Sequence, residues 1–113
     1  MLSEGFHKRE IPLERIAQVT SSNTAKIHGL GGKGQVEIGF DADFCLFDPS
    51  KEVKVTQSMM HDASDYSIFE GRVFHGWPIM TISSGERTMN NGVVVAKPGR
   101  GRVLRSSLKD AGA

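Results

Sequence analysis

The spacing of the hydrophobic residues changes from a helical to an extended period near residue 30, and this change limits the fold most strongly. Leu13, Ile16, Ala17 and Thr20 follow one another at i, i+3, i+4 and i+7, so they lie on one face of a helix. Beyond residue 30, the segment 36–40 alternates apolar and polar side chains, as a half-buried strand does. This order predicts a mainly β chain with one or two N-terminal helices.

The expected helical segment covers residues 12–30 and follows a polar lead-in at residues 1–11. Pro12 suits the first turn of a helix, where its missing N–H is not needed. The run 20–23 has poor helix propensity and is expected to end the first helix. Asn23 would then cap a short second helix, which Gly29 ends in a left-handed conformation.

The β portion is expected to span residues 31–96. The apolar run 44–47 favours a short strand covered on both faces, closed by Asp48-Pro49. Val53 and Val55 indicate another strand. The irregular segment 57–71 is rich in Met and aromatic residues, so we expect these side chains to pack against another surface.

Two further signals concern the last strands and the tail. The extended stretch 73–82 contains Gly76 and Pro78, which imply a bend or an edge position. Asn91-Gly92, followed by three valines, predicts a hairpin. The basic, Gly- and Ser-rich segment 97–113 is expected to be an arm that lies on a surface.

Composition excludes several functional classes. The formal net charge of +1 gives no global field for nucleic acid or an anionic membrane. A hydrophobic fraction of 38% predicts a thin core whose apolar faces need an outside partner. No stretch approaches the roughly 18 apolar residues of a membrane span, and residues 1–10 show no signal peptide. Cys45 is the single cysteine, expected to be a buried, reduced thiol, which suits the cytoplasm.

None of the motifs that often carry chemistry is complete. The glycine-rich run 29–34 has the spelling G-x-G-x-x-G, but the mechanism needs a strand before it and a helix after it, and here the order is reversed. Asp41 and Asp43 flank a predicted turn, where carboxylates more often cap backbone amides than hold a metal. The serine pairs 21–22 and 83–84 lack a base partner or a G-x-S-x-G elbow. We therefore predict no catalytic, cofactor-binding or metal-binding residues.

The histidines and the basic tail give equally weak signals. His7, His28, His61 and His75 never occur as H-x-H or H-x-x-x-H, the spacing that lets two imidazoles reach one zinc ion. The tail 97–102 lacks the interleaved aromatics of a nucleic-acid patch, so a solvated or subunit-bridging arm is the favoured interpretation.

Several ordered segments resemble the C-terminal end of the cyclic amidohydrolases, the family of hydantoinase, dihydropyrimidinase, allantoinase and dihydroorotase. Residues 22–30 (S-N-T-A-K-I-H-G-L) resemble the family's S-x-N-P-A-K-I-F-G-L, although Thr24 replaces the proline. Residues 39–49 (G-F-D-A-D-F-C-L-F-D-P), preceded by K-G at 33–34, resemble K-G-x-I-x-x-G-x-D-A-D-L-v-v-f-D-P.

The later segments resemble the hydantoinase/dihydropyrimidinase branch. Residues 65–71 (D-Y-S-I-F-E-G) are similar to D-Y-S-x-F-E-G, and residues 97–105 (K-P-G-R-G-R-V-L-R) to its K-P-G-x-G-x-x-L-R tail. Ser84 and Asp62 depart from the branch, which usually has Arg and His at those places. The resemblance runs in order from about residue 12 to residue 105.

The resemblance implies a parent enzyme with a (β/α)₈ barrel that holds two divalent metals, usually zinc, and a β-sandwich built from both chain ends. This chain would supply part of the composite sandwich and the last barrel helix, and the ligand-bearing barrel strands would precede it. It is therefore expected to be inactive alone, to bind no metal, and to pair with the missing barrel portion or with itself as a homo-oligomer. The alternative is a self-standing small β interaction module, and a nucleic-acid binder that uses the basic tail is a third, weaker reading.

Overall fold

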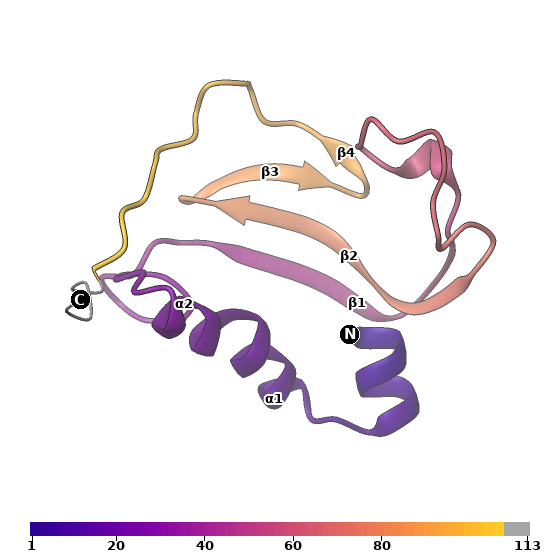
Figure 1. Ribbon diagram of the computed structural model, residues 1–113, viewed down its shortest axis with the longest axis horizontal. Helices are drawn as coiled ribbons and strands as arrows, with labels where there is room; N and C mark the ends of the chain where they lie inside the picture. The colour runs from indigo at the N-terminus through magenta and orange to yellow at the C-terminus, as the bar shows by residue number, and fades with distance from the viewer. Residues whose placement is uncertain (108–113) are drawn as a thin grey trace, which may run out of the picture.

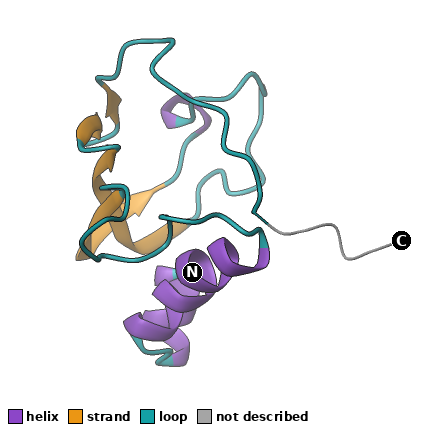
Figure 2. Ribbon diagram, turned by 90° about the vertical axis from the view of Figure 1, so that its left-hand side faces the viewer, coloured by secondary structure: helices purple, strands orange, loops and turns teal. Residues whose placement is uncertain are grey.

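The computed structural model describes residues 1–107, which form one antiparallel sheet with helices along one side. The strands pair in the order β1-β2-β3-β4, and each neighbouring pair is antiparallel (Figure 1). Figure 2 shows the N-terminal helices as a separate layer below the strands. The elements are η1 (Leu2–His7), α1 (Leu13–Ala17), η2 (Gln18–Ser22), α2 (Asn23–Ile27), β1 (Phe44–Lys54), η3 (Gln57–Met59), β2 (Val73–Ser83), β3 (Glu86–Asn90) and β4 (Val93–Val94). A mainly β chain with N-terminal helices is thus confirmed.

The predicted break in the helical segment is wrong. Ser22 and Asn23 both have right-handed helical backbone angles, and no side-chain cap is present at Asn23. Helical structure therefore runs from α1 through η2 into α2. Within this helix the Thr20 hydroxyl donates to the Ile16 carbonyl, four residues earlier, over 2.7 Å.

The predicted helix end is confirmed. Gly29 has φ +60°, the left-handed conformation that glycine adopts without a Cβ penalty. The Leu30 amide then donates to the Ala25 carbonyl over 2.9 Å, which satisfies one carbonyl of the last helical turn.

The two strands predicted on either side of Asp48-Pro49 are one continuous strand, β1. Both halves pair with the same partner, β2, with Phe44 opposite Ile82 and Lys54 opposite Val73. The predicted interruption survives as a register shift between Asp48 and Glu52. There the Asp48 carboxylate accepts hydrogen bonds from the Ser50 amide and hydroxyl, a local turn that bends the strand without ending it.

The bend predicted in the long strand β2 lies at Gly76 and Pro78. Gly76 has φ +82°, and a Cβ there would lie 3.1 Å from Leu2 of η1. Pro78 pairs with Phe47 of β1, whereas β3 reaches only Met80–Ser83 of β2. Since no strand of the described residues pairs with the other side of β2 at Pro78, its missing N–H costs no ladder bond there.

The strand predicted at 36–40 is wrong. The Phe40 amide donates to the Glu37 carbonyl, so the segment turns instead of extending. Val36 and Ile38 are 84% and 102% exposed. Alternating apolar residues form a strand only where a sheet edge offers a partner, and none of the described strands lies there.

Burial on the sheet is also lower than the sequence predicts. Cys45 and Leu46 are exposed, so the expectation of a strand covered on both faces, and of a buried Cys45, is wrong. Within the described residues no second layer covers them. The hairpin at Asn91-Gly92 is confirmed, because both residues have positive φ (46° and 82°) and join β3 to β4.

The hydrophobic core is small. Ile16, Ala25 and Val55 are the buried hydrophobic side chains among the described residues, and Val55 is 2% exposed. The segment 57–71 is irregular, as predicted, but it packs only in part: Tyr66 and Ile68 are 69% and 76% exposed. The chain therefore offers large apolar side chains to solvent on several elements.

Candidate functional site: an ionic cluster that anchors the C-terminal arm

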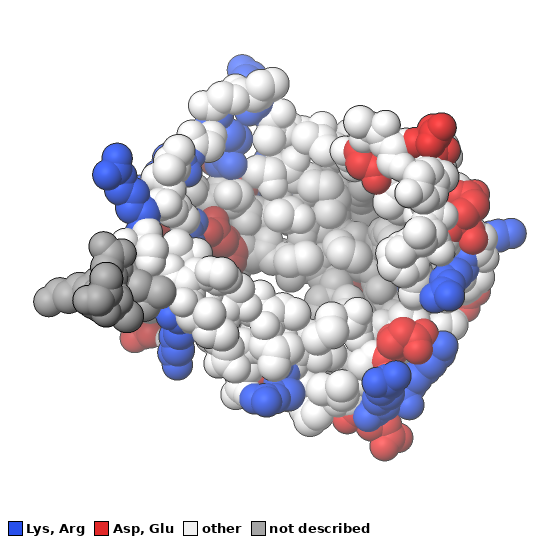
Figure 3. All heavy atoms as spheres, in the orientation of Figure 1, with Lys and Arg blue, Asp and Glu red and all other residues white. Residues whose placement is uncertain are grey.

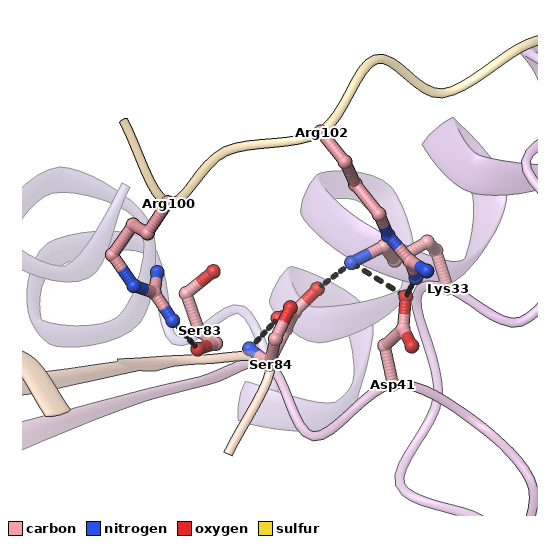
Figure 4. Close-up of polar contacts among 7 residues, drawn as sticks. Lys33, Asp41, Ser83, Ser84, Arg100 and Arg102 are labelled. Atoms are coloured by element: carbon pink, nitrogen blue, oxygen red, sulfur yellow. Dashed lines mark hydrogen bonds and ion pairs between the residues drawn. The ribbon is translucent and has the colours of Figure 1, made fainter. Parts of the chain in front are cut away.

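The main polar cluster forms around Lys33, in the loop between α2 and β1. Its ammonium contacts Asp41 Oδ2 at 2.9 Å and also pairs with Asp43. The second oxygen of Asp43 accepts a hydrogen bond of 2.7 Å from the backbone amide of Ser84, in the turn between β2 and β3. One lysine and two carboxylates therefore tie the loop to the β2–β3 turn, at the end of the sheet where β1 begins (Figure 4).

The C-terminal arm, residues 97–107, lies against this cluster. Arg102 donates to Asp41 Oδ2 at 2.6 Å, and Arg100 donates to the Ser83 carbonyl at 2.6 Å and to Glu86 at 3.1 Å. Ser107 donates through its amide and hydroxyl to the Gly29 carbonyl, each over 2.8 Å. Residues 97–107 of the predicted arm 97–113 thus run along this cluster, whereas its remainder, 108–113, lies outside the described residues.

The cluster stabilises the charged forms of its members. Hydrogen bonds from Lys33 and then Arg102 lower the pKa of Asp41. The pKa of Asp43 is lowered first by Lys33 and then by the Ser84 amide. In return, hydrogen bonds to Asp43 and Asp41 raise the pKa of Lys33. All three groups are therefore ionised at neutral pH.

A cavity of about 390 Å³ lies between the arm and this cluster. Lys33, Arg100 and Arg102 line it together with Asp41 and the two serines Ser83 and Ser84. Each of the three cations already contacts a carboxylate. The three positive charges of this site are therefore neutralised by carboxylates. We interpret the cluster as an anchor for the C-terminal arm and not as an anion-binding pocket.

The aspartates predicted to cap backbone amides do so in part. Asp43 accepts the Ser84 amide, but its main partner is Lys33, and Asp41 binds two cations. The sequence analysis missed Lys33, Arg100 and Arg102 as members of one site. Arg102 and Asp41 stand 61 positions apart, and no local spacing pairs residues at such a distance.

The other residues considered from the sequence lie apart from this cluster. His7 donates through Nε2 to the Pro49 carbonyl over 2.7 Å, and its ring centre lies 6.0 Å from that of His75. His61 contacts the Gly92 carbonyl. Over residues 1–107 no three His, Cys, Asp or Glu side chains gather in a way that could hold a metal ion.

The glycine-rich run 29–34 ends α2 and forms the loop that follows it. Gly34 has φ +84° and lies so close to α2 that a Cβ would meet Ala25 at 2.7 Å. The run thus allows the loop to cross the helix closely, as expected for a helix-to-strand turn. Ser83 and Ser84 belong to the anchor, the former through its carbonyl and the latter through its amide.

The comparisons with known proteins agree with this fold. The model of the amidohydrolase family matches residues 5–88. The allantoinase of Rubrobacter xylanophilus is 40% identical over 105 residues, which cover 93% of this chain and 23% of that protein. The dihydropyrimidinase of Rattus norvegicus is 36% identical over 102 residues, covering 89% of this chain and 20% of that protein.

Solved structures show the same segment in three dimensions. The crystal structure of dihydropyrimidinase from Brevibacillus agri superposes with a TM-score of 0.87 at 36% identity, covering 96% of this chain and 24% of that one. The antiparallel sheet with its N-terminal helices thus matches one part of hydantoinase-type structures. The chain belongs to the amidohydrolase family. It spans between 20% and 24% of the length of these three relatives.

One structural finding concerns membranes. Among the helices of residues 1–107, none has the length and apolar composition needed to cross a bilayer.

Proposed function

We propose that this chain is the C-terminal sheet portion of a metal-dependent hydrolase of cyclic amides, of the hydantoinase/dihydropyrimidinase type, and that it is not catalytic alone. The named relatives, an allantoinase and two dihydropyrimidinases, support the reaction class. This chain covers between 20% and 24% of the length of these relatives, which supports its role as one part of a larger enzyme. Its natural partner would be the barrel-bearing portion of such an enzyme.

The single observation that carries this proposal is the amount of exposed surface. The chain exposes 8739 Å², whereas the size scaling for compact monomers predicts about 6,100 Å² for a chain of this length. The excess of roughly 2,600 Å² per chain corresponds to the surface that one partner of an obligate complex buries. A structure with three buried hydrophobic side chains and this much open surface is expected to be completed by another polypeptide.

The distribution of charge supports the same role. Figure 3 shows a hollowed face whose Lys, Arg, Asp and Glu side chains lie mostly around the rim, while other residues line the centre. A surface with an uncharged centre and a charged rim is typical of protein interfaces. The outward valines Val93, Val94 and Val95 in and after β4 add to the apolar area available.

The metal centre that the resemblance implies does not fit the described residues of this chain. No cluster of three metal-binding side chains exists among residues 1–107, so we assign no catalytic step to any of them. The two metals would be held by the barrel portion. A cytoplasmic setting is part of the proposal, since an exposed single thiol such as Cys45 persists in a reducing compartment.

The test is fragment complementation. A hydantoinase-type relative, such as the Brevibacillus agri enzyme, is truncated before the segment that matches this chain, and the two pieces are co-expressed. We expect this chain alone to show no ring-opening of hydantoin or dihydrouracil and no tightly bound zinc. With the truncated relative, we expect a stable complex, because the excess surface becomes buried.

Several outcomes would count against the proposal. Turnover together with about two metal ions per isolated chain would show that the chain is an enzyme by itself. A stable monomer on gel filtration that neither binds the truncated relative nor binds a hydrophobic dye would favour a self-standing β module. Self-association without any complex would place a second copy on the open face.

A further inference from the structure

The C-terminal arm is held in place almost entirely by polar contacts. Its apolar residues Val103 and Leu104 are both exposed, so little hydrophobic burial fixes it. Within residues 97–107 no segment pairs as a strand with the sheet. Figure 1 shows the arm leaving β4 and returning to the end of α2, where Ser107 meets Gly29.

The contacts of the arm form a closed circuit through four parts of the chain. Arg102 binds Asp41, which also binds Lys33. Lys33 pairs with Asp43, and Asp43 accepts the amide of the β2–β3 turn. That turn and the start of β3 in turn bind Arg100 of the arm, through the Ser83 carbonyl and the Glu86 carboxylate. Every link in the circuit involves at least one charged group.

Two of these links, Arg102–Asp41 and Arg100–Glu86, are open to solvent. The side chain of Arg102 is 65% exposed and that of Glu86 is 74% exposed. Ion pairs at such positions are weak and are screened by salt. Lys33, with a side chain 17% exposed, is the most sheltered cation of the circuit.

We propose that residues 97–107 form a salt-sensitive strap, closed over the cavity beside Lys33 by the Arg102–Asp41 and Arg100–Glu86 pairs and released when these pairs are screened or removed. Release separates the arm from the loop 28–43 and from the β2–β3 turn, and it opens the cavity lined by Lys33, Asp41 and Ser84. The sheet stays folded during this change, because none of its strand pairs includes a residue of the arm. This inference stands apart from the proposed enzymatic role.

The test measures amide hydrogen exchange by NMR on the full chain. The Ser107 amide, which donates to Gly29, reports closure of the strap, and the Val55 amide, which donates to Arg72, reports the sheet. Raising the salt concentration from about 0.1 M to about 1 M shortens the Debye length from about 10 Å to about 3 Å. We expect Ser107 to lose about fivefold in protection, or about 1 kcal/mol, the upper range for an exposed pair.

A pair of matched variants separates the ionic link from a general effect of salt. Arg102→Gln removes the pair with Asp41. Arg105→Gln makes the same chemical change at an arginine whose side chain forms no ion pair or hydrogen bond with the residues that the structure describes. At low salt, Arg102→Gln should lower Ser107 protection about fivefold, and Arg105→Gln should leave it unchanged. Protection at Val55 should be the same in all three proteins.

Two results would overturn the proposal. Equal Ser107 protection in the wild-type chain and in Arg102→Gln, at both salt concentrations, would mean that the ionic pairs do not hold the strap. A parallel loss of protection at Ser107 and Val55 would mean that the whole fold loosens instead of the arm. A loss confined to Ser107 supports the strap.

Discussion

Asp41 binds two cations at one oxygen: its Oδ2 lies 2.9 Å from Lys33 Nζ and 2.6 Å from Arg102. One carboxylate therefore joins the loop before β1 to the C-terminal arm. Lys33 precedes Asp41 by eight positions and Arg102 follows it by 61. Asp41 therefore connects its own loop to the distant C-terminal arm, and both ion pairs require its carboxyl group to be ionised.

Replacement of Lys33 by Gln is expected to raise the pKa of both Asp41 and Asp43, because Lys33 is the first cause of the low value in each. Their folded pKa values lie below the ordinary 3.8, so the stability that they contribute is present above that value and is lost as pH falls through the folded pKa. NMR titration of the side-chain carboxyls measures both values.

The matched control for this variant is Lys97→Gln, at a lysine that forms no ion pair within residues 1–107. It should leave both aspartate titrations in place. Unchanged titrations in Lys33→Gln would mean that Lys33 does not hold these carboxylates in solution.

Gly34→Ala is expected to destabilise the chain more than Gly32→Ala. Both glycines have positive φ (84° and 76°), so either substitution incurs about 1–2 kcal/mol of backbone strain. At Gly34 a Cβ would also lie 2.7 Å from the Ala25 Cβ and 2.9 Å from the Ser21 carbonyl oxygen. This overpacking is expected to add about 1–3 kcal/mol. Urea denaturation of the two variants measures the difference, and equal midpoints would show that the loop does not cross α2 so closely.

The sequence predicts those elements whose signals are local. The left-handed end at Gly29, the Asn91-Gly92 hairpin and the helical face around Ile16 depend on residues within a few positions of one another, and all three are present. The break at residues 20–23 was wrong, since propensity is a weak prior and the Thr20 hydroxyl bonds to the carbonyl of Ile16.

The errors at the sheet have a different cause. Alternation at residues 36–40 and the apolar run at Cys45 and Leu46 indicate burial, but in this chain both are exposed. Apolar patterns of this kind indicate burial but not the surface that provides it, and within residues 1–107 no element covers these side chains. The cluster around Lys33 and Asp41 could not be predicted, because the Asp41–Arg102 pair joins residues 61 positions apart, where no spacing rule applies.

Val55→Ala is expected to cost about 2 kcal/mol of unfolding free energy. Val55 is 2% exposed and its side chain loses two carbon groups, each worth about 0.8 kcal/mol, with a further cavity term. Val36→Ala makes the same chemical change at a residue that is 84% exposed, so it should be close to neutral in the isolated chain. Thermal or urea denaturation of both variants measures the contrast.

The same pair of variants carries information about the partner. If the open surface is covered in a complex, Val36→Ala should weaken binding to the truncated relative even though it leaves the free chain unchanged. Affinity measured by titration calorimetry tests this point. A loss of stability at Val36 in the free chain would mean that residue 36 is already packed there.

Cys45 is expected to react with a soluble thiol reagent in the folded, isolated chain. It is the single cysteine and is exposed on β1, opposite Thr81 of β2. Labelling measured by mass spectrometry should therefore reach one equivalent under native conditions, at a rate close to that in denaturant. Cys45→Ser is the control, and it should take up no label.

The rate should fall when the chain is bound to the truncated relative, if the partner covers the face of β1 on which Cys45 lies. The labelling rate of Cys45 thus distinguishes two ways of covering the exposed apolar surface of the sheet. Protection that appears only with the relative supports a heterologous complex, whereas protection that rises with the concentration of this chain alone supports a second copy. Slow labelling at every concentration of the isolated chain would contradict the exposed position of the thiol, because no element within residues 1–107 covers it.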